Sequence, residues 1–226
     1  QMQGYTFKGW YADKECVGDP IRIIPANSTG NLNLYAKWNE NHYTVIFHSN
    51  DGKSYSKEQS FAYSENIALE KNSFVRDGYS FSGWATESNG EVMYTDQQMI
   101  SGLSDADNGI VDLYAVWTAD TYSIIYKNME NAVNAEDNLT EFTLEDNLIT
   151  LHDPSKAGYT FDGWYADSAF TKKVSNTITL DAAHDWIFYA KWTANQYVIT
   201  FDSCLGITVP TETQMMIYDN ETQLTL

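Results

Sequence analysis

The sequence predicts tandem copies of a small, strand-dominated mixed-sheet domain of the α+β class, with an all-β domain as the alternative. Three observations lead to this prediction. The motif Gly-Tyr-x-Phe-x-Gly-Trp occurs at residues 4–10, 78–84 and 158–164. Each copy is followed by Tyr-Ala-x-Trp, and then by a strand-like alternation of apolar and polar residues. Self-similarity at a nearly fixed period indicates one structural unit used several times, and it favours a modular array over a single catalytic site.

Each unit opens with a period-two pattern of aromatic and β-branched residues, which is typical of a half-buried strand. The residues in this pattern are Tyr43, Val45 and Phe47; Tyr122, Ile124 and Tyr126; and Tyr197, Ile199 and Phe201. In the unit that begins at Tyr43, an Asp-Gly turn at residues 49–52 precedes a second alternating stretch with Phe61 and Tyr63. The first two strands of that unit are therefore expected to form a hairpin. Further turns at 64–66, 145–147 and 219–221 lead to short apolar stretches.

The Gly-Tyr-x-Phe-x-Gly-Trp motif predicts a third strand with its aromatic residues on one face. Its two glycines are expected where a turn or a close backbone approach excludes a Cβ atom. The variable segment that follows contains residues 95–100 or 181–184, each of which is expected to form one or two helical turns with a Thr or Asp cap. The closing strands at 32–38, 111–117 and 187–192 are nearly continuous in apolar residues, as a central strand would be.

Aligning the copies gives two complete repeats, residues 43–117 and 122–192, between two halves. Residues 1–38 correspond to the C-terminal half of a repeat, and residues 197–226 correspond to the N-terminal half. The joints at 39–42, 118–121 and 193–196 have only four residues each, too few for flexible tethers. Neighbouring units are therefore expected to keep a fixed orientation in an elongated array. Each terminal half is expected to dock on the complete repeat beside it, with only weak, concentration-dependent head-to-tail association. The alternatives are that it pairs with the opposite half of another chain, or that the true domain boundary lies inside this repeat frame.

Composition excludes several classes of function. The chain has 13 Lys and Arg against 31 Asp and Glu, a formal net charge of −18, which disfavours binding to nucleic acid or to an anionic membrane surface. No apolar stretch is long enough to span a membrane, and residues 1–20 do not form a signal peptide, so targeting and anchoring segments are expected to lie outside this sequence. Two cysteines, Cys16 and Cys204, exclude a disulfide framework and are interpreted as unrelated thiols rather than as a crosslink.

Residues 158–167, Gly-Tyr-Thr-Phe-Asp-Gly-Trp-Tyr-Ala-Asp, and residues 189–201, which begin Tyr-Ala-Lys-Trp, resemble the Listeria-Bacteroides repeat, also called the internalin B-type B-repeat. The resemblance spans nearly the whole chain. It implies a β-grasp-like module of the ubiquitin or SUMO type, found in tandem in secreted or wall-attached bacterial surface proteins. It also implies a role as a stalk and interaction segment, with no catalytic residues and no cofactor. Two local departures, Ala85-Thr86 after the second motif and Lys127–Met129 after an opening strand, affect loop geometry only.

No group of residues has the spacing of a catalytic or metal site. The four histidines, His42, His48, His152 and His184, lie at unrelated repeat positions and are interpreted as surface or turn residues. The acidic segment 105–112 resembles a calcium loop, but its glycine falls one position early and Val116 stands where the bidentate Glu belongs. It is therefore interpreted as a solvated loop.

Aromatic residues are the remaining candidates for binding. The tryptophans that recur in every copy are expected to lie in the core, namely Trp10, Trp84, Trp164, Trp38, Trp117 and Trp192. Five aromatic residues fall outside this shared pattern and are the candidates for contact with a ligand: Tyr11, Tyr55, Tyr94, Tyr165 and Trp186. The expected partners are neighbouring repeats and a host or cell-surface protein or glycan, with no nucleic acid and no direct membrane insertion. The stalk and the recognition module remain the two alternatives.

Overall fold

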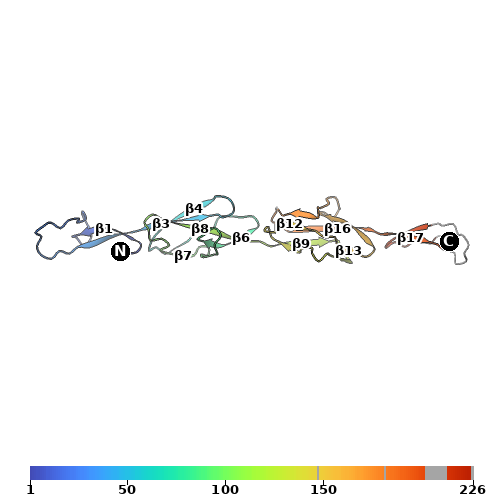
Figure 1. The fold of residues 1–226 in the computed structure, drawn as a ribbon, viewed down its shortest axis with the longest axis horizontal. Helices are drawn as coiled ribbons and strands as arrows, with labels where there is room; N and C mark the ends of the chain where they lie inside the picture. The colour runs from blue at the N-terminus through green and yellow to red at the C-terminus, as the bar shows by residue number, and fades with distance from the viewer. Residues whose placement is uncertain (147, 181, 202–212, 225–226) are drawn as a thin grey trace. The chain divides into compact units, whose positions relative to one another are not determined.

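The computed structural model describes residues 1–226 except 147, 181, 202–212 and 225–226. The chain divides into two compact units, Gln1–Thr118 and Ala119–Leu226. Each unit contains one complete repeat and one separate two-stranded hairpin (Figure 1). The described residues form strands β1 to β18 and no helix.

The first unit contains β1 (Tyr5–Tyr11), β2 (Tyr35–Glu40), β3 (His42–His48), β4 (Ser56–Ala62), β5 (Ile67–Ala68), β6 (Tyr79–Ala85), β7 (Met99–Ile100) and β8 (Gly109–Ala119). Strands β1 and β2 form an antiparallel hairpin by themselves. The complete repeat has a four-stranded sheet in the order β4-β3-β8-β6, with β3 antiparallel to β4 and parallel to β8. The expected hairpin of the first two strands is therefore confirmed, and the closing strand β8 is central.

The second unit contains β9 (Tyr122–Lys127), β10 (Ala132–Val133), β11 (Glu141–Phe142), β12 (Leu148–Thr150), β13 (Ser155–Lys156), β14 (Tyr159–Tyr165), β15 (Thr177–Thr179), β16 (Trp186–Ala194), β17 (Gln196–Thr200) and β18 (Thr213–Ile217). Its sheet has the equivalent order β11-β9-β16-β14, with β9 parallel to β16. Strand β11, which pairs with β9, is shorter than β4, its counterpart beside β3. In the second unit, β10 also pairs with β13. Strands β17 and β18 form a second separate hairpin.

Each complete repeat has its own hydrophobic core, and the alternation of the opening strand explains how the core forms. In β3, Tyr43, Val45 and Phe47 are buried on one face of the sheet. They pack with Trp84 of β6 and Leu113 of β8. In the second unit, Ile124, Trp164 and Phe188 occupy the equivalent positions. Since apolar alternation places every second side chain on one face, the sheet has one buried face.

The expected helical turns are wrong, and the described part of the chain is all-β rather than α+β. Residues 95–98 form a turn in which Gln97 has φ of 57°, a left-handed conformation that a right-handed helix excludes. Met99–Ile100 then pair with Ile67–Ala68, which places Ile100 in the core. Residues 182–184 are bends that lead into β16, and the expected cap at 181 lies outside the described residues.

The second glycine of the motif lies at a β-bulge. The register between β1 and β2 shifts between Phe7 and Gly9, and the register between β14 and β16 shifts between Phe161 and Gly163. At the equivalent Gly83, φ is 148°, and an added Cβ would lie 2.7 Å from the backbone oxygen of Tyr94. The glycine therefore allows the loop after the motif to lie against the bulged strand.

Candidate functional site

An asparagine in the joint connects successive hairpins of the first unit. The backbone N–H of Asn41 donates to the carbonyl oxygen of Gly4 at 2.9 Å, and the carbonyl of Asn41 accepts from the N–H of Tyr63 at 3.0 Å. Residues 1–40, which form the terminal half of a repeat, are called the half-unit. Gly4 opens the motif of the half-unit, and Tyr63 directly follows β4 of the next repeat. One residue of a short joint thus holds both neighbours through main-chain hydrogen bonds.

The second unit repeats this joint with equivalent residues. Asn195 donates to the carbonyl oxygen of Gly158 at 2.9 Å and accepts from the N–H of Tyr218 at 2.9 Å. Here the motif belongs to the complete repeat, and the following hairpin is β17–β18. Two joints with the same bonds, made from different segments, indicate a repeated structural device rather than an incidental contact.

A tyrosine ring covers the motif glycine in both joints. Gly4 and Gly158 have φ of 75° and 76°, which favours glycine. A Cβ atom at Gly4 would lie 2.0 Å from Cδ1 of Tyr63, and one at Gly158 would lie 2.3 Å from Cδ1 of Tyr218. Glycine is therefore required on two independent grounds, backbone conformation and space.

Side-chain hydrogen bonds reinforce each joint. The hydroxyl of Thr6 donates to Oδ1 of Asn41 at 2.5 Å, and the hydroxyl of Thr160 donates to Oδ1 of Asn195 at 2.7 Å. In the first joint, Nδ2 of Asn41 also donates to the carbonyl oxygen of Asp105 at 2.7 Å. Because Asn41 is 5% exposed, these bonds satisfy a buried amide.

The two joints differ in their ionisable groups. In the first, the N–H of Ser64 donates to Oε1 of Glu40 at 2.7 Å, and the Ser64 hydroxyl donates to the same oxygen. The hydroxyl bond and the N–H bond hold the pKa of Glu40 below its usual value. In the second joint, the hydroxyl of Tyr159 donates to Asp219, and this bond raises the pKa of Tyr159.

The acidic segment that resembles a calcium loop contacts the first joint. The carbonyl of Asp105 accepts from Asn41, and Oδ1 of Asp107 accepts from the N–H of His42 at 3.4 Å. The N–H of Asn108 donates to the carbonyl of His42 at 2.7 Å. These contacts give the loop a structural role beside the joint, which its interpretation as merely solvated did not include.

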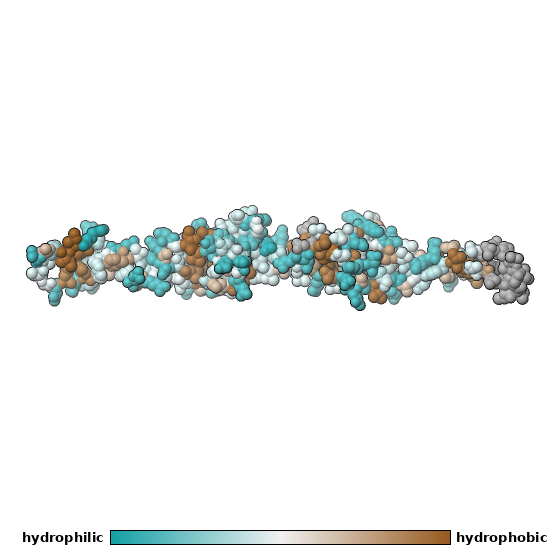
Figure 2. Space-filling model, in the orientation of Figure 1, coloured by the Kyte–Doolittle hydropathy of each residue, from teal (hydrophilic) through white to brown (hydrophobic). Residues whose placement is uncertain are grey.

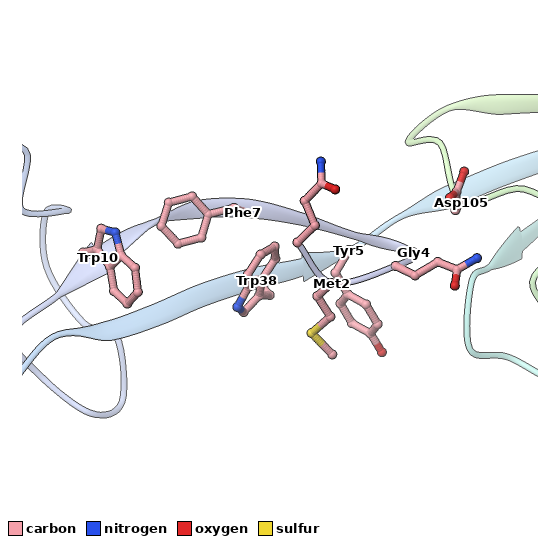
Figure 3. Close-up of a pocket in the computed structure, with 9 residues that line it drawn as sticks. Met2, Gly4, Tyr5, Phe7, Trp10, Trp38 and Asp105 are labelled. Atoms are coloured by element: carbon pink, nitrogen blue, oxygen red, sulfur yellow. The ribbon is translucent and has the colours of Figure 1, made fainter.

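An aromatic ladder runs along the β1–β2 hairpin. The ring of Phe7 lies between those of Trp10 and Trp38, with centroid distances of 5.5 and 5.2 Å (Figure 3). These rings, together with Met2, Tyr5 and Asp105, line an open groove of about 980 Å³. The same ladder occurs in the complete repeats, where Phe81 lies 4.9 Å from Trp84 and Phe161 lies 5.2 Å from Trp164.

The ladders differ in how much of the motif tryptophan is exposed. Trp84 and Trp164 are 1% and 0% exposed, whereas Trp10 is 47% exposed. The expectation that the recurring tryptophans lie in the core is therefore wrong for Trp10. The physical reason is that Phe47 of β3 covers Trp84 at 4.8 Å and Tyr126 of β9 covers Trp164 at 4.9 Å, whereas residues 1–40 contain no opening hairpin. Figure 2 shows hydrophobic residues on the surface of this half-unit.

The structure places four of the five predicted ligand-contact residues in or against packed surfaces. Tyr11 and Tyr165 are 6% and 9% exposed, and a lysine lies over each ring, Lys37 at 5.4 Å and Lys191 at 5.3 Å. Tyr94 and Trp186 pack against the cores of their repeats. Tyr55 is 61% exposed. The structure does not bring the five together, and Tyr55 is the one exposed side chain among them.

Titratable side chains do not gather into a chemical centre in the described part of the chain. No group of three His, Cys, Asp or Glu residues there has the geometry to hold a metal ion. His48 pairs with Asp112 at 2.7 Å and stacks on Tyr114. Cys16 is a free thiol, and Cys204 lies outside the described residues.

Sequence reasoning located the joints but missed the contacts that fix them, and it missed the exposed ladder. A signal for the joint was present, since Asn41 and Asn195 hold the same place in their four-residue joints, and Tyr63 and Tyr218 both follow the second strand. The signal for the exposed ladder was that residues 1–40 contain the motif but no opening strand. A motif without its opening strand lacks the residue that covers its tryptophan.

Comparisons with known proteins agree with this repeat pattern. The sequence model described as the Listeria-Bacteroides repeat domain matches residues 1–37, 43–116 and 122–191. The two later matches are complete repeats, and the first covers the β1–β2 hairpin.

Two proteins of Evansella cellulosilytica are similar over most of this chain. One, provisionally named a Gly-rich membrane protein, is 28% identical over 211 residues, which are 88% of this chain and 23% of the relative. The other, provisionally named a membrane protein, is 29% identical over 175 residues, which are 76% of this chain and 24% of the relative. The chain thus spans about a quarter of the length of these relatives. In the described residues of this chain there is no helix of the length and apolarity that crossing a bilayer would need.

Proposed function

This chain belongs to the Listeria-Bacteroides repeat family, and from this premise we propose that it is a non-catalytic spacer segment of a bacterial cell-surface or secreted protein. The names of the two relatives support a membrane-associated context. We infer that the repeat is β-grasp-like, because its strand order is second, first, last, third, with the first and last strands parallel. A helix packed on the sheet would complete the ubiquitin-like version, and the described residues have none.

The repeated joint is the observation that carries the spacer proposal. A spacer must hold neighbouring repeats at a fixed separation and orientation, and a four-residue joint can do so only if its backbone is fixed. Asn41 and Asn195 supply that fixation with the same main-chain bonds. Tyr63 and Tyr218 add a ring packed on a glycine, which leaves little room for bending. A binding function would need no such repetition.

The test of this proposal is the width of a distance distribution across the first joint. Cys16 and Cys204 are replaced by Ser, and spin labels are attached to cysteines introduced at Lys8 of β1 and Lys57 of β4. Both positions are exposed, and they lie on opposite sides of the joint along the chain. We expect a single narrow distribution in the whole chain. Gly4→Ala should broaden it, because Tyr63 can no longer pack on residue 4. The matched control, Gly18→Ala, changes a glycine with positive φ and open space around it and should leave the width unchanged. A broad distribution in the unmodified chain would contradict the spacer role.

A second candidate function is recognition of a protein or glycan, and the aromatic groove is the observation that favours it. Flat rings such as those of Phe7, Trp10 and Trp38 suit stacking on sugars or anchoring of a partner side chain. The five aromatic residues predicted to contact a ligand give this proposal less support than expected, since Tyr55 is the one exposed member among them. Binding of glycan arrays by the whole chain, and its loss with Trp10→Ala, would favour recognition over the spacer role.

A further inference from the structure

The two complete repeats differ at one edge of their sheets. In the first repeat, β4 pairs with every residue of β3. In the second, β11 pairs with β9 only at Tyr122 and Ser123, and one more main-chain bond joins the N–H of Ile124 to the carbonyl of Thr140 at 2.7 Å. Both repeats are complete, so a missing half does not explain the difference.

The segment that could have extended this pairing takes a different course in the second repeat. It comprises residues 128–139, and its Ala132–Val133 pair with Ser155–Lys156 instead of with β9. The segment returns to β9 at Leu139, whose carbonyl accepts from the hydroxyl of Tyr126 at 2.9 Å. This contact is made by the phenol and leaves the main chain of Tyr126 out.

The main chain of β9 therefore has an open edge, defined here as the outer side of residues 125–127. Because N–H groups alternate in direction along a strand, the N–H of Tyr126 points to the same side as that of Ile124. Its counterpart Phe47 pairs on this side with Lys57. In the part of the chain that the structure describes, no strand residue pairs with the open edge. Phe47 is 1% exposed, whereas Tyr126 is only half-buried.

The open edge lies in an acidic part of the sequence. Residues 128–155 contain no Lys or Arg, whereas the equivalent residues 49–75 contain three basic and four acidic side chains. The acidic residues of the first of these segments are Glu130, Glu136, Asp137, Glu141, Glu145, Asp146 and Asp153. Unlike charges attract, so these surroundings favour a cationic partner.

The closed edge of the first repeat shows where a basic side chain fits. There Lys57 lines a small cavity together with Glu70. In the second repeat, His152 takes the place of Glu70, because the N–H of each donates to a side-chain amide, at 2.7 Å to Oδ1 of Asn138 in the case of His152. The acidic residues 136–137 directly precede Asn138. A lysine in the equivalent place would thus find carboxylates close by in the chain.

We propose that an extended, basic segment of another protein adds to the open edge of β9 as an antiparallel strand, in the place that β4 has in the first repeat. Its main chain bonds to Tyr126, and a Lys or Arg stands opposite Tyr126 as Lys57 stands opposite Phe47. A second copy of this chain is a poor occupant, because the net charge of −18 makes two copies repel. The interaction goes beyond the spacer function, which requires no partner.

A synthetic peptide is the probe for the whole chain. Its sequence is Thr-Lys-Val-Lys-Val-Lys-Thr, acetylated and amidated at its ends, so that lysines alternate with smaller residues. One control peptide carries a methyl group on the main-chain nitrogen of each lysine, which keeps the charge and removes the N–H groups that would face β9. A second control peptide has Ser in place of each Lys, which keeps the main chain and removes the charge.

Hydrogen exchange of single amides gives the readout. Saturating peptide should slow the exchange of the Tyr126 amide roughly tenfold or more, because its N–H gains an acceptor. The amide of Phe47 is the control within the molecule, since β4 already covers it, and its exchange should not change. The methylated peptide should give no protection of Tyr126. The Ser peptide should bind roughly tenfold more weakly or worse.

Two charge-reversal variants test the acidic surroundings. Asp137→Lys combined with Glu141→Lys should weaken binding of the Lys peptide roughly tenfold or more. The matched control combines Glu87→Lys with Glu91→Lys, which changes the net charge equally at exposed positions of the first repeat and should leave binding unchanged. Thermal melts establish that both variants are folded.

Four outcomes would overturn the proposal. If the Tyr126 amide without peptide is as protected as that of Phe47, the edge is already closed. If this protection rises with protein concentration and sedimentation shows dimers, the occupant is a second copy. Equal protection of Tyr126 by the methylated peptide would show attraction of charges without strand addition. Equal binding of the Ser peptide, or of the Lys peptide to the Asp137 and Glu141 variant, would show that the partner need not be basic.

Discussion

The half-unit at residues 1–40 and the complete repeat after it carry the same motif, and they differ in what surrounds it. Both form the motif hairpin, both have a positive φ at the second motif glycine, and both place a Phe ring next to the motif Trp. Only the complete repeat buries the indole. The motif is thus sufficient for the hairpin and the ladder, and the opening strand is needed for the core.

The joint beside the half-unit is nevertheless fully formed. Asn41 makes both of its main-chain bonds, and Tyr63 covers Gly4, although Trp10 remains exposed. The residues that connect repeats are therefore separable from the residues that stabilise each repeat. Docking of the half-unit on its neighbour takes place at this joint, but it does not cover the ladder.

The largest expected effect comes from replacing the motif tryptophan, either in a complete repeat or in the half-unit. Trp84→Ala or Trp164→Ala should destabilise its own repeat by about 3–5 kcal/mol, because a large buried ring leaves a cavity. Trp10→Ala should cost less than about 1 kcal/mol, because its ring is half exposed. Urea denaturation followed by circular dichroism measures the loss, and hydrogen exchange assigns it to a repeat. An unchanged midpoint for Trp84→Ala would show that burial does not decide the stability of the repeat.

The separability of joint and core can be tested at the motif glycine. Gly4→Ala should lower the hydrogen-exchange protection of the Asn41 and Tyr63 amides about tenfold or more, while β3 and β8 keep theirs. The cause is a Cβ atom that overlaps the Tyr63 ring at a left-handed φ. Gly18→Ala shares the positive φ but has open space and serves as the control. Loss of protection throughout the complete repeat would mean that joint and core are not independent.

Acid should loosen the first joint through Glu40. Its pKa is lowered by the hydrogen bonds from Ser64, so its contribution to stability is fully present above the ordinary value of 4.5. That contribution is lost as the pH falls through the lowered pKa of the folded state. Glu40→Gln should remove this part of the acid dependence. Amide exchange of Ser64 between pH 5 and pH 3 is the measurement, and an identical pH dependence in Glu40→Gln would exclude Glu40 as its source.

The smallest effect is expected from metal removal. The loop at residues 105–109 holds Asn41 and His42 through its own backbone and the Asp107 carboxylate, so its order depends on these hydrogen bonds. Chelator should leave the melting temperature of the chain unchanged. A rise of several degrees with submillimolar calcium would show that the segment binds the ion after all.

Much of the strand arrangement could be predicted from local patterns. Alternation in Tyr43, Val45 and Phe47 located β3 and its buried face, and the apolar closing strand indicated the central β8. The turn at residues 95–98 could not be predicted, because a left-handed Gln97 and tertiary pairing of Ile100 overrode a plausible helix start. Local propensity is a weak prior when a buried contact competes with it.

The site was harder to predict for a different reason. Tyr63 and Gly4 are far apart in sequence and belong to different repeats, so no local pattern joins them. Trp10 was placed in the core by analogy with Trp84, and this analogy ignored the strand that provides the cover. The burial of a side chain depends on the whole repeat, including strands outside the motif. The motif alone therefore does not predict it.

The joint also has a genetic consequence. The joints at Asn41 and Asn195 each take their glycine from one repeat and their tyrosine from the next, with the asparagine between them. Duplication or deletion of one whole period keeps the motif glycine, the third joint residue and the residue after the second strand in register at the new boundary. A change of any other length separates the glycine from its tyrosine and leaves a boundary that cannot close. Recombination between copies can therefore lengthen or shorten such a gene in whole periods, and selection for folded protein removes the other products.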